Sequence, residues 1–382
     1  MADVNRVWIL GAGFSKALGG PLIKDLLAKR ASAMLASLFP TAEHGDISDE
    51  QYRVRVLYDY GRERGYWDHA EQFLDLAESA ADEAKTRYER ARTAPGSEPG
   101  PKSHGATLLE SLMKGVVPDP ERQTRTIGPA TVSPAHRWID FDDVEILARA
   151  ARRALAVDCS VFLRSAQLNT ERWQPYKDWA NRLHAKDTVI TFNYDHVPEL
   201  LAAETRKLRV VSPVDAIGDL DSARTLGVPV VLKLHGSVTW ARGVRGVQVI
   251  NVEDAALGNP ATDFLLGVPG PGKRKVYLDS LKPLRDAAMA AIREAQGVIF
   301  VGYRFPPTDG DTRRDILGSI GRNRQKAFLG IQTVLGPKVH DDDSNRLLHL
   351  LGTAVTRDRV TQVPLYAEDY LSLMGLGDDG NP

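Results

Sequence analysis

The chain has 382 residues, 43% hydrophobic and 26% charged, which is the composition of a globular protein with a substantial core. A net charge of −1 gives no overall attraction to nucleic acid or to an anionic membrane surface. The single cysteine, Cys159, excludes an internal disulfide and a cysteine-based zinc cluster. Without an export signal or an apolar stretch of about 18 residues, we expect a cytoplasmic protein.

The first predicted element is a buried strand over 6–10, a short apolar run that ends at Gly11. The glycine turn Gly11–Ser15 follows it, and a helical pattern of leucines begins after Pro21. A strand, glycine turn and helix in this order can bind phosphate, because glycines let the backbone approach it and a helix N-terminus offers free N–H groups. A tight turn without a ligand is the alternative.

The dinucleotide fingerprint of dehydrogenases is incomplete at this turn. Its third glycine is replaced by Lys16, and residues 29–36, where an acid would hold a ribose hydroxyl, contain none. The turn therefore does not predict a dehydrogenase.

Residues 41–185 carry mostly helical patterns and are expected to form a large helical insertion. The range 70–92 is rich in Ala, Glu and Arg, and apolar residues recur at helical spacing over 144–155. Loops rich in Pro and Gly are expected near 93–101 and 117–134.

Strands return after the insertion and alternate with helical stretches. The predicted strands are 188–192, 228–234, 297–302 and 327–335, and the predicted helices are 197–206, 281–295, 312–322 and 344–351. Alternation of this kind predicts an α/β fold, a Rossmann-like doubly wound parallel sheet covered on both faces. Residues 1–40 and 186–382 would form this domain.

Polar residues follow three of these strands, where a doubly wound sheet binds its ligands. They are Thr191-Phe192-Asn193-Tyr194-Asp195, His235-Gly236-Ser237 and Gly302-Tyr303-Arg304-Phe305-Pro306-Pro307. Each alone is typical of a capped turn or of a structural histidine. Together they predict one site at the edge of the sheet that holds the glycine turn.

Four motifs in order resemble the sirtuin-like family. They are Gly-Ala-Gly-Phe-Ser at 11–15, Thr-Phe-Asn-Tyr-Asp at 191–195, Leu-His-Gly-Ser at 234–237 and Gly-Tyr-Arg-Phe-Pro at 302–306. The resemblance covers roughly 1–30 and 186–340 and implies an NAD-binding fold that cleaves the nicotinamide–ribose bond.

The resemblance also implies roles for individual residues. Asn193 would contact the nicotinamide ribose and order a water, His235 would be the general base, and Asp195 would lie near the carboxamide. The NAD-binding residues it implies are Gly11, Ala12, Gly13, Phe14, Ser15, Thr191, Asp195, Gly302 and Tyr303.

Two departures separate the chain from the family's protein deacylases. Their four-cysteine zinc module is excluded by the cysteine count, so no metal is expected, and their Pro-Asp-Phe-Arg segment is replaced by Pro21-Leu22-Ile23-Lys24. The chain resembles instead the prokaryotic branch that hydrolyses NAD to nicotinamide and ADP-ribose, often in anti-phage defence.

Other activities and the control of the site stay open at this point. A non-catalytic NAD or ADP-ribose sensor and a zinc-free deacylase are the alternatives, and the presence of both Asn193 and His235 favours the enzyme. Because free NAD hydrolysis would drain the cell, we expect gating by homo-oligomerisation or by a separate partner such as an ATPase.

Overall fold

The computed structural model describes residues 4–27, 45–93, 102–115, 141–163, 166–243, 246–251, 262–268, 273, 276–325, 328–337 and 341–376. Its centre is a parallel sheet with the strand order β10-β9-β8-β1-β2-β4-β3. The strands are β1 (Arg6–Leu10), β2 (Thr188–Thr191), β3 (Arg209–Val210), β4 (Val230–Lys233), β8 (Gly297–Val301), β9 (Gly330–Val334) and β10 (Val360–Val363). This confirms the predicted α/β class.

Both faces of the sheet are covered by helices, which explains the apolar runs in its central strands β1 and β8. Val7 and Ile9 of β1 face one core, while Trp8 and Leu10 face the other. The first core includes residues of α13 (Lys282–Glu294), α14 (Gly310–Gly321) and α15 (Asp341–Gly352). The second includes residues of α8 (Gln174–Arg182), α9 (Val197–Thr205) and α16 (Ala367–Leu376). Helix α10 (Ala216–Leu226) adds Ala216 to the first core.

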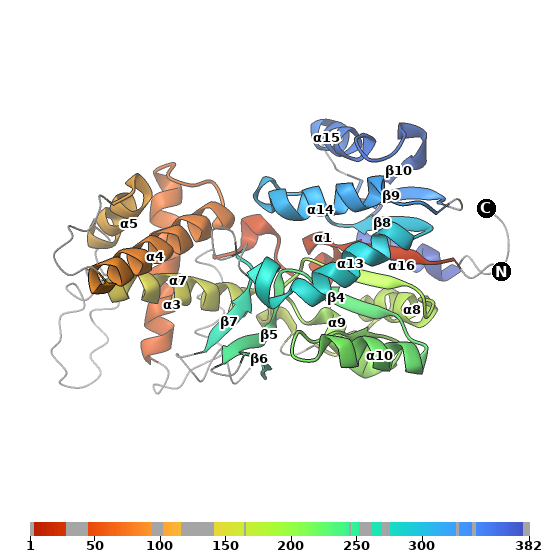
Figure 1. Cartoon of the computed structure of the whole chain (residues 1–382), viewed down its shortest axis with the longest axis horizontal. Helices are drawn as coiled ribbons and strands as arrows, with labels where there is room; N and C mark the ends of the chain where they lie inside the picture. The colour runs from red at the N-terminus through yellow and green to blue at the C-terminus, as the bar shows by residue number, and fades with distance from the viewer. Residues whose placement is uncertain are drawn as a thin grey trace.

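Four helices form a separate group with a core of their own. They are α3 (Gly45–Glu63), α4 (Ala70–Thr93), α5 (His104–Gly115) and α7 (Phe141–Asp158). Figure 1 shows this group beyond the end of the sheet toward which β1 runs. Inside the group, the guanidinium of Arg55 pairs with the buried carboxylate of Asp158, with Nη2 and Oδ1 2.7 Å apart. Because β1 runs toward it, the helical group faces the carboxyl ends of the strands, where the sequence predicts the site.

A small antiparallel sheet, which no pattern in the sequence predicts, joins the two parts. Its order is β6-β5-β7, formed by β5 (Gly236–Gly243), β6 (Gly246–Val249) and β7 (Asp263–Leu266). Phe264 of β7 packs in the core of the helical group, and the next residue, Leu265, packs in the core of the large sheet. Successive side chains of a strand point to opposite faces, so the single strand β7 contributes to both cores.

The four predicted strands and the helices of the second half are confirmed with small shifts of their ends. The helix expected after Pro21 is wrong within the described residues: Ile23–Asp25 form one 3₁₀ turn, and a one-turn helix, α1 (Ala12–Ser15), begins already in the glycine motif. Leu27 has a φ of 58° and donates its N–H to Asp158, which ends any helix there.

Other predictions are refined or lie outside the described residues. The loops expected near 93–101 and 117–134 fall almost entirely outside them. Helix α8, within the range assigned to the insertion, packs on the large sheet through Tyr176 and Trp179, and Trp173 just before the helix joins the same core. Among the described helices, none combines the length and apolar character that crossing a bilayer requires.

Candidate functional site

A cavity of about 620 Å³ lies at the carboxyl ends of the strands, between the large sheet and the helical group. Eight of the predicted site residues line it: Gly11, Ala12, Gly13, Asn193, Asp195, His235, Gly302 and Tyr303. They follow β1, β2, β4 and β8, which are neighbours in the sheet. The fold thus brings together groups that lie up to 292 positions apart in the chain, counted from Gly11 to Tyr303.

The glycine turn packs backbone against backbone on the loop after β8. A Cβ on Gly13 would lie 2.7 Å from the Cα of Gly302, and one on Gly11 would lie 2.5 Å from its carbonyl oxygen. The N–H groups of Gly11 and Gly13 are also used here, donating to Val301 and Gly302. The glycines are therefore required by this contact, whereas the expectation was an open cradle of free N–H groups.

Three of the predicted contact residues do not line the cavity. Phe14 is a correction: its ring packs in the core against Tyr176 and Trp179, with centroids 5.1 and 5.3 Å apart. Ser15 and Thr191 lie beneath the cavity wall and support residues that do line it. A strand end presents only some of its side chains to the ligand side, and the motif alone does not reveal which.

A hydrogen-bonded chain holds Asn193 and Asp195 in place. The amide nitrogen Nδ2 of Asn193 donates to the carbonyl oxygen of Gly11 (3.0 Å) and to Oγ of Ser15 (3.1 Å). Ser15 Oγ in turn donates to Oδ2 of Asp195 (2.7 Å), and burial raises the pKa of this carboxyl. Both amide donors of Asn193 are committed, so its carbonyl oxygen Oδ1 is the group left to accept a hydrogen bond from a ligand.

His235 leaves the sheet at the end of β4 and is only 5% exposed. The next residue, Gly236, has a φ of 86°, and a Cβ there would overlap the carbonyl oxygen of Leu265, so the turn requires glycine. Below the turn, the fully buried Lys233 donates to the carbonyl oxygen of Asp195 (2.5 Å) and to Oγ of Ser237 (2.7 Å). This network ties the loop of the histidine to the loop of Asn193.

The imidazole of His235 is neutral in this structure. Burial and, after it, the charge of Lys273 lower its pKa to about 3, against the opposing effects of Asp309 and of a hydrogen bond with the backbone of Phe192. Its Nε2 is buried and has no hydrogen-bond partner among the described residues. A neutral ring with a free lone pair has the form that a general base needs.

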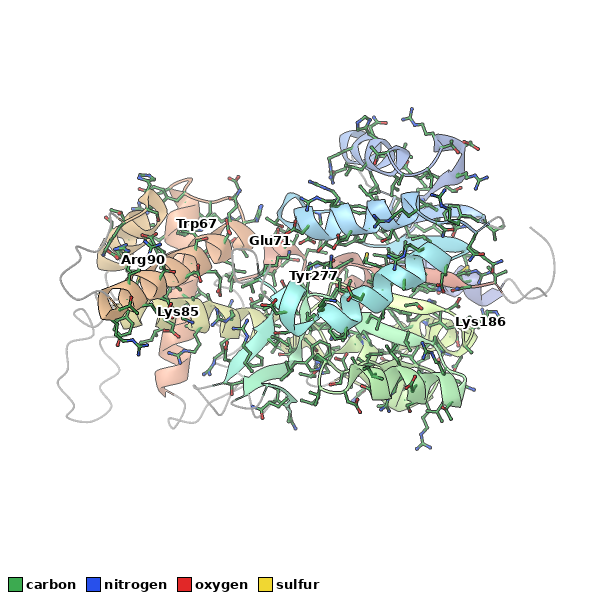
Figure 2. The ribbon with its side chains drawn as sticks, in the orientation of Figure 1. Trp67, Glu71, Lys85, Arg90, Lys186 and Tyr277 are labelled. Carbon is green, nitrogen blue, oxygen red and sulfur yellow. The ribbon has the colours of Figure 1, made fainter. Side chains whose placement is uncertain are left out.

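Several residues at the cavity were not predicted from the sequence. Asp309, near the start of α14, accepts a hydrogen bond from the Tyr303 hydroxyl (3.1 Å) and from the ammonium of Lys273. Glu71 of α4 accepts one from Thr308 (2.8 Å), and burial raises its pKa. Figure 2 shows Glu71 where the helical group meets the sheet. Neither acid belongs to a motif, so the only available signal was its tertiary position.

Cationic and acidic side chains line other parts of the wall. Lys16, which replaces the third glycine, and Lys24 follow the glycine turn, and Arg304 follows Tyr303. Glu368 comes from the first turn of α16. The wall thus offers cations suited to phosphate and an acid suited to a hydroxyl group. Cys159 also lines it, but burial raises the pKa of the thiol well above its usual value, which makes the thiol unreactive.

No model of a known protein family matches the chain, and no curated protein matches it.

Proposed function

We propose that the protein binds NAD in this cavity and hydrolyses its nicotinamide–ribose bond, releasing nicotinamide and ADP-ribose. The observation that carries the proposal is that two suitable groups line the same cavity as the glycine turn. They are the neutral imidazole of His235 and the hydrogen-bond acceptor Oδ1 of Asn193. A cavity of about 620 Å³ is also within the usual size range of cofactor and small-molecule sites.

The charges around the cavity support NAD as the ligand. NAD carries a cationic nicotinamide ring at one end and an anionic pyrophosphate in its middle. Lys16, Lys24 and Arg304 suit the pyrophosphate, which the committed N–H groups of the glycine turn cannot hold alone. Asp309 suits the cationic end: burial raises its pKa, but His235, Lys273 and the Tyr303 hydroxyl together lower it below its usual value, so that it is ionised.

The bond-breaking step requires little covalent participation from the protein. Nicotinamide leaves as a neutral molecule with the electron pair of the C–N bond, and positive charge develops on the ribose. A water then attacks the anomeric carbon and gives its proton to Nε2 of His235. Oδ1 of Asn193 accepts a hydrogen bond from a ribose hydroxyl or from this water and fixes its position.

The biological role that we propose is NAD depletion in prokaryotic anti-phage defence, inside the cytoplasm. An unregulated hydrolase would drain its own cell, so the activity must be switched on by self-association or by a partner protein such as an ATPase. The helical group lines the cavity through Glu71 and Leu74 and is the natural element to report such contacts to the site.

One observation favours a second function, a sensor that binds NAD or ADP-ribose without cleaving it. The Nε2 atom of His235 is buried in this structure, so a substrate hydroxyl reaches it only after a local rearrangement. If that rearrangement never occurs, the site binds and does not react.

Measuring nicotinamide release from NAD, with and without an acetylated peptide, tests the proposal. We expect release without the peptide, at a rate that rises with protein concentration if self-association activates it. Release that depends on the peptide would identify a deacylase. Saturable binding of NAD without release, at every protein concentration, would identify the sensor.

Glu368 is expected to make the site select NAD over NADP. Its carboxylate lies on the cavity wall, where it can accept hydrogen bonds from the hydroxyls of the adenosine ribose and repel a 2′-phosphate. Glu368→Gln should reduce the NAD/NADP ratio of kcat/KM about tenfold, because one charged hydrogen bond and one repulsion are lost.

Glu171→Gln, on the exposed 3₁₀ turn before α8, is the matched control and should leave the ratio unchanged. An unchanged ratio in Glu368→Gln as well would place the adenosine ribose elsewhere.

A further inference from the structure

Asp309 lies at the centre of a buried cluster on the cavity wall and is only 3% exposed. Its Oδ2 accepts a hydrogen bond from the Tyr303 hydroxyl at 3.1 Å. Its Oδ1 accepts one from the ammonium of Lys273 and lies 3.6 Å from Nε2 of His235. Lys273 and His235 therefore face the same carboxylate oxygen.

The ring of His235 is placed so that charge on it would be felt by this oxygen. The backbone of Phe192 holds the ring by a hydrogen bond, and Phe192 also packs against it with centroids 4.8 Å apart. Nε2 is left buried and without a hydrogen-bond partner among the described residues. A buried nitrogen without a hydrogen-bond partner costs free energy, and its lone pair remains able to accept a proton.

We propose that Asp309 is the positioning residue of His235, stabilising the ring when Nε2 takes up a proton, and that Lys273 holds the same oxygen and keeps the base weak. This rests on the proposed function, in which an O–H bond of water breaks, its proton goes to Nε2 and its electron pair forms the new bond to the ribose. The imidazolium that results would lie beside the Oδ1 atom of Asp309. Movement of Lys273 away from Asp309 strengthens the base.

The charged groups around His235 shift its pKa in the directions that this proposal requires. Asp309 raises the pKa of His235 and Lys273 lowers it. The other titratable groups at this part of the wall include Glu71 and His69 from the helical group and the phenols of Tyr194 and Tyr303. Burial raises the pKa of Glu71 and of both phenols, so the phenols stay neutral, and Lys273 and Asp309 are the charged groups that act on His235.

Titrating His235 itself tests the proposal without relying on turnover. In protein with isotope-labelled histidine, the imidazole signals are followed by NMR between pH 5 and 8, with His235→Gln used to assign the signal. We expect His235 to stay neutral throughout in the wild-type protein and to begin titrating in Lys273→Met. In the double variant Lys273→Met/Asp309→Asn it should be neutral again.

The outcomes separate the proposal from a purely structural role. A His235 that stays neutral in Lys273→Met, or that titrates alike in the single and double variants, overturns it. Asp309→Asn keeps a hydrogen-bond acceptor for the Tyr303 hydroxyl, and its melting temperature checks that it folds. If Asp309→Asn does not fold, the titration of His235 in Lys273→Met is compared with that in the wild type. This comparison still tests the proposal, because Lys273→Met leaves Asp309 in place.

Turnover gives a second readout that depends on the proposed function. Asp309→Asn should lower kcat for NAD cleavage about 10- to 100-fold with little change in KM, and Lys273→Met should raise kcat. Equal kcat values in all variants overturn the proposal. If no variant cleaves NAD while the titrations follow the expected order, the proposed function fails and the Asp309–His235 coupling stands.

Discussion

His235→Ala is expected to lower the rate of nicotinamide release from NAD by about 100- to 10,000-fold, the usual contribution of a general base. His235 lines the cavity, and its unpartnered Nε2 faces Oδ1 of Asp309. Its removal leaves the attacking water without a proton acceptor. NAD binding should change little, because in the proposed binding mode the phosphates and the adenosine contact other parts of the wall.

Asn193→Ala should lower the same rate about 100-fold by a different route, since it removes the acceptor Oδ1 and the two hydrogen bonds that fix the loop after β2. His104→Ala, on the exposed start of α5, is the control and should keep wild-type activity. Rates are compared at equal protein concentration and with NAD binding measured in parallel. Full activity in His235→Ala or Asn193→Ala would remove the basis of the proposed hydrolysis.

Gly302→Ala is expected to destabilise the protein by about 2–5 kcal/mol and to abolish NAD binding. The residue has a φ of 66°, which side chains disfavour, and a Cβ there would lie 2.5 Å from the Cα of Gly13. The only relief is separation of the glycine turn from the loop after β8. These two loops line the same cavity, so stability and binding should be lost together.

The matched control is Gly310→Ala, eight positions along the same segment at the first residue of α14, where a Cβ would meet nothing within 4 Å. It should be neutral or stabilising by up to about 1 kcal/mol, because alanine restricts the unfolded chain. Urea denaturation of both variants gives the comparison. A Gly302→Ala protein as stable as the wild type would mean that the loops are not in contact.

The local hydrophobic pattern was sufficient to predict those strands and helices whose burial is regular along their length. β1 is apolar from Val7 to Leu10 because both faces of the sheet are covered, and α4 buries residues at helical spacing from Ala70 to Ala80. The small antiparallel sheet escaped prediction because β6 and β7 have four residues each, β6 is mostly exposed and β5 is buried at consecutive positions, so none of the three shows a clear alternation. The leucines after Pro21 suggested a helix, but Leu26 and Leu27 pack in the core of the helical group instead.

For the site, the sequence identified the loops better than the roles of their residues. Asn193 and His235 could be placed at strand ends, and the parallel sheet brings such ends together by its geometry. The burial of Phe14 and the backbone contact behind Gly11 could not be foreseen, because both depend on what packs behind the turn. Asp309, Lys273 and Glu71 carry no motif, and their importance arises only from their distances to one another.

By itself, the sequence determined the class of the fold and the strand ends at which polar groups gather, because hydrophobic periodicity and glycine turns are local properties. Only the tertiary structure decided which atoms remain available: both donors of the Asn193 amide are committed, which leaves its Oδ1, and Nε2 of His235 has no hydrogen-bond partner among the described residues. Such availability depends on packing and on competition for hydrogen bonds, and both are settled by residues that are distant in the chain.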